Sequence, residues 1–220
     1  MTRRHFVLLI LEIRMRCPET NLFRNGLKEQ KVTHDYKNTR SNEYATTGDF
    51  CRIYLEQMNN LYLLSLLLTA NPQKAERCFL SGFDDSASNH FVFKERAHSW
   101  ARRSIILHAI QLLRPRPTDE NRSHEARLSP PIEKIPVEVQ AHPNLVGIVR
   151  LNSFERFVFI MSVLEMYSHQ ECSLLLGCFR RDVINARTTA IRNLAAFVTA
   201  SGKQPISDLA LGSSFVEAGL

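Results

Sequence analysis

The chain has 220 residues, of which 44% are hydrophobic, so it can form one large or two small folded domains and is not disordered throughout. Its formal charge of +6 favours an anionic partner but does not distinguish nucleic acid from a membrane surface. Only eight glycines are present, and no run of alternating polar and apolar residues occurs, which argues against a mainly β fold. We therefore expect an all-α protein.

Residues 1–49 are basic and lack a sustained helical period, so we expect a poorly ordered basic N-terminal extension. An apolar run from Phe6 to Leu11 follows two arginines, as in a secretory signal, and predicts a short strand or helix at Phe6. The run is far shorter than the roughly 20 apolar residues that cross a bilayer, and Glu12 interrupts it. We expect no membrane partner.

The five cysteines are scattered at positions 17, 51, 78, 172 and 178 without a C-x-x-C pair. This spacing indicates neither a disulfide framework nor a zinc site, and it favours a reducing cytoplasm. No metal and no cofactor are expected.

Residues 50–113 are predicted to form a three-helix bundle, because their apolar residues recur at helical spacing. Asn71-Pro72 separates the first helix from the second, and the polar segment from Asp84 to His90 has the composition of a loop. The expected helices run from Phe50 to Leu68, from Pro72 to Phe83 and from about Phe93 to Leu113.

A proline-rich linker is predicted over residues 114–149, because six of the nine prolines lie there among charged and serine residues. The last stretch, residues 198–220, is expected to be a frayed tail. The chain thus consists of two helical blocks joined by an extended segment.

The second block, residues 150–197, has the outline of a helix-turn-helix, with two short helices, a glycine turn and a longer helix. Asn152 and Ser168 each precede a glutamate by three residues, which is a typical helix start. Gly177 is the expected stop of the second helix, since glycine readily adopts a left-handed conformation.

The last helix, from Arg180 onward, has two contrasting faces. Its apolar residues at spacings of three and four predict a buried face: Val183, Ala186, Ala190, Leu194 and Phe197. A helical projection places Arg181, Asn185, Thr188 and Arg192 together on the opposite face. Such side chains suit base edges and phosphates, and Arg180 lies beside them at the helix start. The alternative is an ordinary solvated polar face.

These residues resemble region four of the extracytoplasmic-function sigma factors. The motifs are L-x-x-x-ER-x-V-F from Leu151, S-x-QE from Ser168, LLG ending at Gly177, DV at Asp182 and A-x-x-x-L from Ala190. In that family the last helix enters the major groove of promoter DNA. The preceding segment contributes phosphate contacts, which here implies Ser168, His169 and Gln170. Phe179 departs from the family pattern, which has a small hydroxyl residue before the recognition helix.

The first block resembles the region two bundle of the same family, through LYLLSLLLTANPQKAERCFLSGF and the helix around Trp100. The resemblance implies that the helix after Asn71-Pro72 binds core RNA polymerase, and it implicates Lys74, Glu76, Arg77 and Leu80. In relatives this helix is acidic, whereas here Lys74 and Arg77 are basic, and Leu80 and Ser81 replace a Gln-Glu pair.

Two functions follow. The first is a sigma factor in the cytoplasm, with promoter DNA, core polymerase and an anti-sigma protein as candidate partners. The second is a sigma-like adaptor or regulator that acts through protein contacts without melting promoters, which the basic residues Lys74 and Arg77 favour. An enzyme is the weakest hypothesis, because neither block contains paired carboxylates, a nucleophile motif, a phosphate loop or a metal-ligand set.

Overall fold

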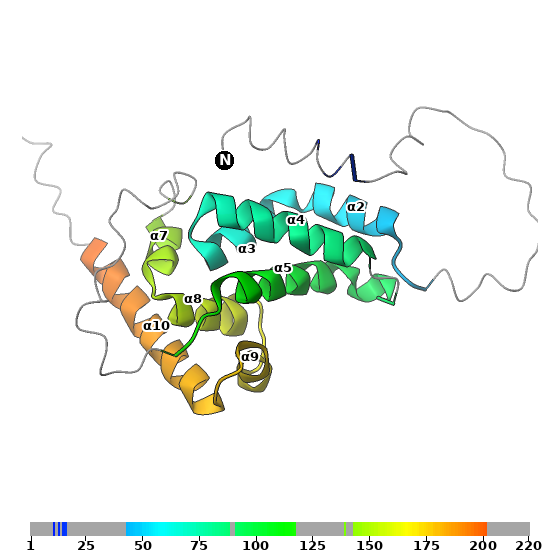
Figure 1. Ribbon diagram of the computed structural model, residues 1–220. Coiled ribbons are helices and arrows are strands. Elements are labelled where there is room, and N and C mark those ends of the chain that lie inside the picture. The colour runs from blue at the N-terminus through cyan, green and yellow to red at the C-terminus, as the bar shows by residue number, and fades with distance from the viewer. Residues whose placement is uncertain are drawn as a thin grey trace, which may run out of the picture.

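A computed structural model describes residues 11, 13, 15–16, 43–88, 91–117, 139 and 143–201 of the chain (Figure 1). All regular elements in these residues are helical, and the only β-type pairing described is an isolated bridge between Tyr44 and Phe93. The predicted all-α class is confirmed for this part of the chain. The element expected at Phe6, most of the linker and the tail beyond Ser201 lie outside the described residues.

The first block contains four α-helices and a 3-10 turn. They are α2 (Thr47–Glu56), α3 (Met58–Thr69), α4 (Pro72–Ser88), the 3-10 turn Lys94–Arg96 and α5 (Ala97–Leu113). The prediction of one long helix from Phe50 to Leu68 is therefore wrong in one respect. The helix breaks at Gln57, whose φ and ψ are −105° and 18°. The spacing of apolar residues could not reveal this break. Buried residues continue directly before and after Gln57, and Gln57 is the single residue between the two helices.

Helix α4 also extends farther than predicted, to Ser88 rather than Phe83. The polar residues that indicated a loop are helical, Ser86 among them is buried in the bundle, and two serines bond back to the preceding turn. The hydroxyls of Ser86 and Ser88 donate to the carbonyl oxygens of Gly82 and Asp84, each over 2.7 Å. A serine that bonds to its own helix in this way is compatible with continued helix.

Large aromatic side chains fill the centre of this bundle. Tyr54, Phe79 and Phe83 are almost completely buried, and Tyr54 meets both phenylalanine rings edge-on with centroids 5.3 and 5.2 Å apart. Helices α4 and α5 approach closely at Gly82, where an added Cβ would lie 2.9 Å from Ile105 Cγ1. The bundle thus combines aromatic packing with one helix contact that leaves no room for a larger residue.

The second block has the predicted order of two short helices and a longer one, preceded by an additional helix. The elements are α7 (Pro143–Arg150), α8 (Ser153–Phe159), a π-helical segment (Ile160–Leu164), α9 (His169–Leu176) and α10 (Arg180–Ser201). Residues 143–149, expected in the linker, belong to α7 instead. This helix is stabilised by packing that the sequence does not display, since Gly147 lies directly under Leu194 and Phe197 of α10.

The two blocks pack against each other, and their buried residues form one continuous core. Helix α3 contacts α7 and α8, and α5 contacts α9, while α10 packs on α7, α8 and α9 at the edge of the molecule (Figure 1). The core also includes Ile13, and Arg16 forms an ion pair with Asp84. At least this part of residues 1–49, expected to be poorly ordered, therefore packs onto the bundle.

A buried arginine joins the blocks. Arg156, in the ER motif of α8, is 7% exposed and donates from Nε to the carbonyl oxygen of Leu68 at the end of α3, over 3.2 Å. Its Nη1 donates to the carbonyl oxygens of Val149 and Leu151, over 3.2 and 3.1 Å. Burial lowers the pKa of Arg156 to about 10, so the side chain stays charged at neutral pH. One cation thus holds the ends of α3 and α7 together.

The cysteines require a correction. Cys51 is disulfide-bonded, whereas Cys78, Cys172 and Cys178 are free. Spacing along the chain could not indicate this bond, because the fold decides which cysteines approach each other. Burial raises the pKa of the Cys78 and Cys172 thiols to about 11, so both are neutral at physiological pH. Within the described part of the chain, no helix has both the length and the apolar character needed to cross a membrane.

Candidate nucleic-acid interface

Helix α10 shows the two faces that the sequence predicts. Val183 and Ala190 are fully buried and Ala186 is 8% exposed, against α8 and α9. The residues on the opposite face are all solvent-exposed: Arg180, Arg181, Asn185, Thr188 and Arg192. The predicted exposure of this stripe is therefore confirmed. We call these five residues the outward stripe of α10.

Both ends of α9, the short helix before α10, also follow the predicted pattern. Ser168 is the N-cap of α9, and its hydroxyl accepts from the backbone N–H of Glu171 over 3.2 Å. The Glu171 carboxylate accepts in return from the Ser168 backbone N–H and from the Ser168 hydroxyl, each over 2.8 Å. These two bonds to the carboxylate lower the pKa of Glu171. Gly177 ends α9 with a φ of 63°, a left-handed conformation that lets the chain reverse towards α10.

The three residues expected to touch phosphates at the start of α9 differ in what they can do. The Ser168 hydroxyl donates to Glu171 Oε2 over 2.8 Å and accepts from the Glu171 backbone N–H over 3.2 Å, so both of its roles are taken. His169 Nε2 accepts from Arg187 Nη1 over 2.9 Å, which ties α9 to α10. Gln170 is exposed. Only Gln170 therefore has a side chain free for an external ligand, while Ser168 and His169 position the two helices.

Phe179 occupies the position directly before α10. Its backbone N–H donates to Asp182 Oδ2 over 3.2 Å, but its own side chain has no oxygen to accept from the first N–H groups of the helix. A missing cap of this kind typically costs about 0.5 to 2 kcal/mol. The ring does not compensate by packing, because Phe179 is 72% exposed. The N–H groups of Asp182 and Val183 bond to the Phe179 carbonyl oxygen instead, over 3.0 and 3.4 Å, so backbone bonds close the start of α10 without a side-chain cap.

Arg181 lies over this exposed ring. Its Cζ is 5.5 Å from the centroid of Phe179, and its Nε is 3.7 Å from Asp182 Oδ1. The Arg181 side chain is 81% exposed. No hydrogen bond of its terminal Nη atoms is found in the described part of the protein, so they can fork onto an external acceptor pair.

Two arginines that the sequence placed in the linker lie next to this site. A groove of about 470 Å³ runs between the C-terminal end of α5 and the turn from α9 to α10, and it is lined by Arg114, Arg116, Phe179 and Asp182, among others. Arg114 and Arg116 are both exposed. No sequence signal could have found them, because only the docking of the two blocks brings the end of α5 beside α10.

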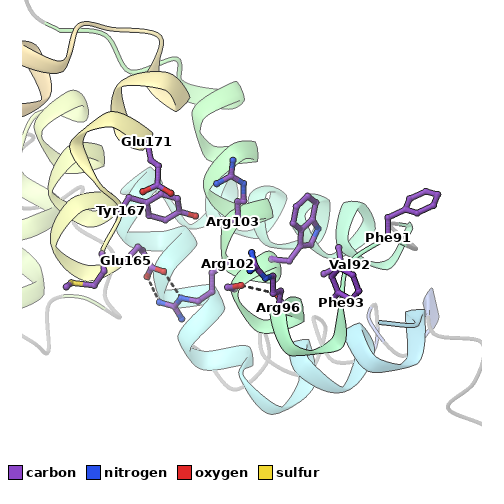
Figure 2. Close-up of a pocket in the computed structure, with 12 residues that line it drawn as sticks. Phe91, Val92, Phe93, Arg96, Arg102, Arg103, Glu165, Tyr167 and Glu171 are labelled. Atoms are coloured by element: carbon purple, nitrogen blue, oxygen red, sulfur yellow. Dashed lines mark hydrogen bonds and ion pairs between the residues drawn. The ribbon is translucent and has the colours of Figure 1, made fainter. Parts of the chain in front are cut away.

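A second cleft, of about 730 Å³, separates α5 from the connection that precedes α9 (Figure 2). Arg102 binds the Glu165 carboxylate there through Nε, over 2.6 Å, and through Nη2. The hydrogen bond to Glu165 raises the pKa of Arg102. Arg103 lies in the same cleft beside Tyr167 and Glu171 (Figure 2). Arg102, which could have been solvated or phosphate-binding, is therefore engaged in joining the blocks.

Trp100 lines the same cleft and is half-buried, with its Nε1 shielded from solvent and without a hydrogen-bond partner among the described residues. Phe91, 87% exposed, and Phe93, 46% exposed, form the outer rim. The cleft thus has an aromatic outer rim, and charged side chains where α5 faces the connection before α9 (Figure 2).

The residues expected to bind polymerase lie on α4, where Lys74 and Arg77 are exposed. Glu76 is half-buried, and Leu80 packs against the core of the bundle. An external partner could therefore contact Lys74 and Arg77 directly, but could reach Leu80 only at its margin.

Comparison with protein-family models finds no match for this chain, and comparison with curated protein sequences finds none either.

Proposed function

We propose that this protein is a transcription initiation factor similar to the extracytoplasmic-function sigma factors, in which α10 reads promoter DNA and the α2–α5 bundle binds core RNA polymerase. The observation that carries the proposal is the outward stripe of α10. It presents Arg181, Asn185, Thr188 and Arg192 on one exposed face of a helix whose other face is buried in a helix-turn-helix. This arrangement is the one with which such motifs enter the major groove.

The stripe has the chemistry for base recognition at its start and for phosphate binding farther along. Arg181 can donate two hydrogen bonds to guanine, and Asn185 can bond to adenine, while Arg192 suits a phosphate. Arg114 and Arg116 extend the positive charge across the groove towards α5. The proposed DNA contact surface therefore includes residues from both blocks.

Removal of single side chains from the stripe tests this proposal. In fluorescence anisotropy with the preferred duplex, Arg181→Ala and Asn185→Ala should each lose about 1 to 3 kcal/mol of binding free energy. Arg192→Ala should weaken binding to all sequences about equally and reduce the slope of log K against log salt by roughly one. Circular dichroism should show that these variants fold, because the substituted residues are exposed.

Val183→Asp is the matched control on the buried face of the same helix, since it places a carboxylate where the native side chain is 0% exposed and should unfold the second block. If folded Arg181→Ala and Asn185→Ala proteins bind DNA with unchanged affinity and sequence preference, α10 does not read DNA.

The second candidate function is a sigma-like adaptor or regulator that acts through protein contacts. It is favoured by the basic residues Lys74 and Arg77 on the exposed face of α4, at positions where the family is acidic. A pull-down with purified core RNA polymerase separates the two functions. Capture of the polymerase by the full chain supports the initiation factor, whereas DNA binding without capture supports the adaptor.

A further inference from the structure

Phe179 is a large aromatic side chain at a position where the fold does not use it. It neither caps α10 nor enters the core, and 72% of it is exposed. A serine there could accept from the helix N–H groups and would expose no ring to water. Residues that break local rules without a structural gain are expected at functional sites.

Asp182 organises the ring together with Arg181. One carboxylate oxygen accepts from the Phe179 backbone N–H over 3.2 Å, and the other lies 3.7 Å from Arg181 Nε. The Arg181 guanidinium is held 5.5 Å from the ring centroid, within the range of a cation–π interaction. The ring and the two terminal Nη groups therefore lie at the exposed tip of α10 as one unit.

We infer that Phe179 is a specificity-determining residue that contacts the methyl group of a thymine next to the guanine bound by Arg181. This inference rests on the proposed DNA-binding function of α10. The thymine methyl and the O6 and N7 atoms of guanine all lie in the major groove, where phenylalanine and arginine respectively suit them. Successive bases of a strand are about 3.4 Å apart along the helix axis, so groups separated by 5.5 Å reach the same or adjacent base pairs.

The Phe179 ring has two effects on sequence preference. Its edge covers the methyl group and excludes water from it, which favours thymine over a pyrimidine without the methyl. Its face restricts the Arg181 guanidinium, which leaves less side-chain freedom to be lost when that group forks onto guanine. A variant that keeps an apolar side chain but loses the aromatic face should separate these effects.

The test begins with selection of the preferred duplex from a random library by the full chain at low salt. Each thymine of that duplex is then replaced singly by deoxyuridine, which removes only the methyl group. One replacement, next to a guanine, should weaken binding about fourfold, the value for one buried carbon. Phe179→Ser should bind the thymine and deoxyuridine duplexes equally. Phe179→Leu should keep the methyl preference but discriminate less well against replacement of the guanine.

Three results would overturn the inference. In the first, the wild-type protein tolerates deoxyuridine next to every guanine. In the second, folded Phe179→Ser keeps the wild-type preference for the methyl group. In the third, the wild-type protein binds no duplex at all, which would overturn the proposed function as well; the first two leave DNA binding by α10 standing.

Discussion

The helices of the first block and the α9–α10 region differ in how many large apolar side chains they leave exposed. Helices α2 to α5 expose none of theirs substantially, and their aromatic residues meet edge-on in the interior. The exposed large apolar residues of the first block, Phe91 and Phe93, lie in the segment between α4 and α5. The α9–α10 region exposes several: Leu174 at 72%, Phe179 at 72%, Val198 at 58%, Ile191 at 45% and Ile184 at 40%. The helices of the first block therefore use their large apolar side chains for packing, while α9, α10 and the turn between them leave several in contact with water.

The largest expected effect comes from removing one aromatic ring from each block. Phe79→Ala deletes a fully buried ring that packs against Tyr54 and should lower the free energy of unfolding by about 3 to 5 kcal/mol. Phe179→Ala removes the same group from an exposed site and should change the free energy of unfolding by no more than about 0.5 kcal/mol. Urea unfolding followed by circular dichroism measures both. Equal losses would show that the exposed ring also supports the fold.

The next effect concerns the buried cation between the blocks. Arg156→Met keeps an apolar chain of similar length but leaves three carbonyl oxygens without their donor, and should cost about 2 to 4 kcal/mol. Arg192→Met, the control, changes an exposed arginine of α10 and should cost less than about 0.5 kcal/mol. Small-angle X-ray scattering should show a larger radius of gyration for Arg156→Met than for the wild-type protein if this residue holds the blocks together. An unchanged radius and stability would mean that apolar contacts alone dock them.

A smaller effect is expected from the ion pair in the cleft of Figure 2. Glu165 is 7% exposed and Arg102 is 34% exposed, so water screens the pair only in part. A double-mutant cycle with Arg102→Ala and Glu165→Ala should give a coupling energy of about 1 to 2 kcal/mol. The energy should decrease only moderately in high salt. A coupling energy near zero would mean that Arg156 and the apolar core hold the two blocks together without help from this ion pair.

The smallest effect is a dependence of stability on pH through the two helix caps. Partial burial favours a higher pKa for Asp49, but hydrogen bonds from Thr46 outweigh it and lower the pKa below the ordinary 3.8. Hydrogen bonds from Ser168 lower the pKa of Glu171 below the ordinary 4.5. Both caps are therefore intact above these ordinary values, and their stabilisation is lost as pH falls through the lowered values.

Thermal melts between pH 6 and pH 3 would measure this loss. The double variant Thr46→Ala, Ser168→Ala removes the hydroxyl of each cap and should show a shallower decline of the melting temperature with falling pH. The same decline in both proteins would mean that other carboxylates cause it.

How much the sequence predicted depended on whether a feature is local. Helix caps and one-sided helical faces involve neighbouring residues, so Ser168 with Glu171, Gly177 as a stop and the exposed face of α10 could all be predicted. The interruption at Gln57 could not, because apolar spacing continues across it. Nor could the extension of α4, where packing buries Ser86 of the polar segment against the rest of the bundle.

The sequence by itself therefore determined an all-α chain, the position of the helix-turn-helix and the side chains on its outer face, since each follows from contacts within a few turns. Only the tertiary structure decided that Arg156 reaches Leu68, that Arg102 pairs with Glu165, and that Arg114 and Arg116 line a groove beside Phe179. These residues are separated by roughly 60 or more positions, and no pattern along a single chain encodes which distant surfaces meet. The docking of the two blocks fixed those contacts, and with them the full extent of the candidate DNA-binding surface.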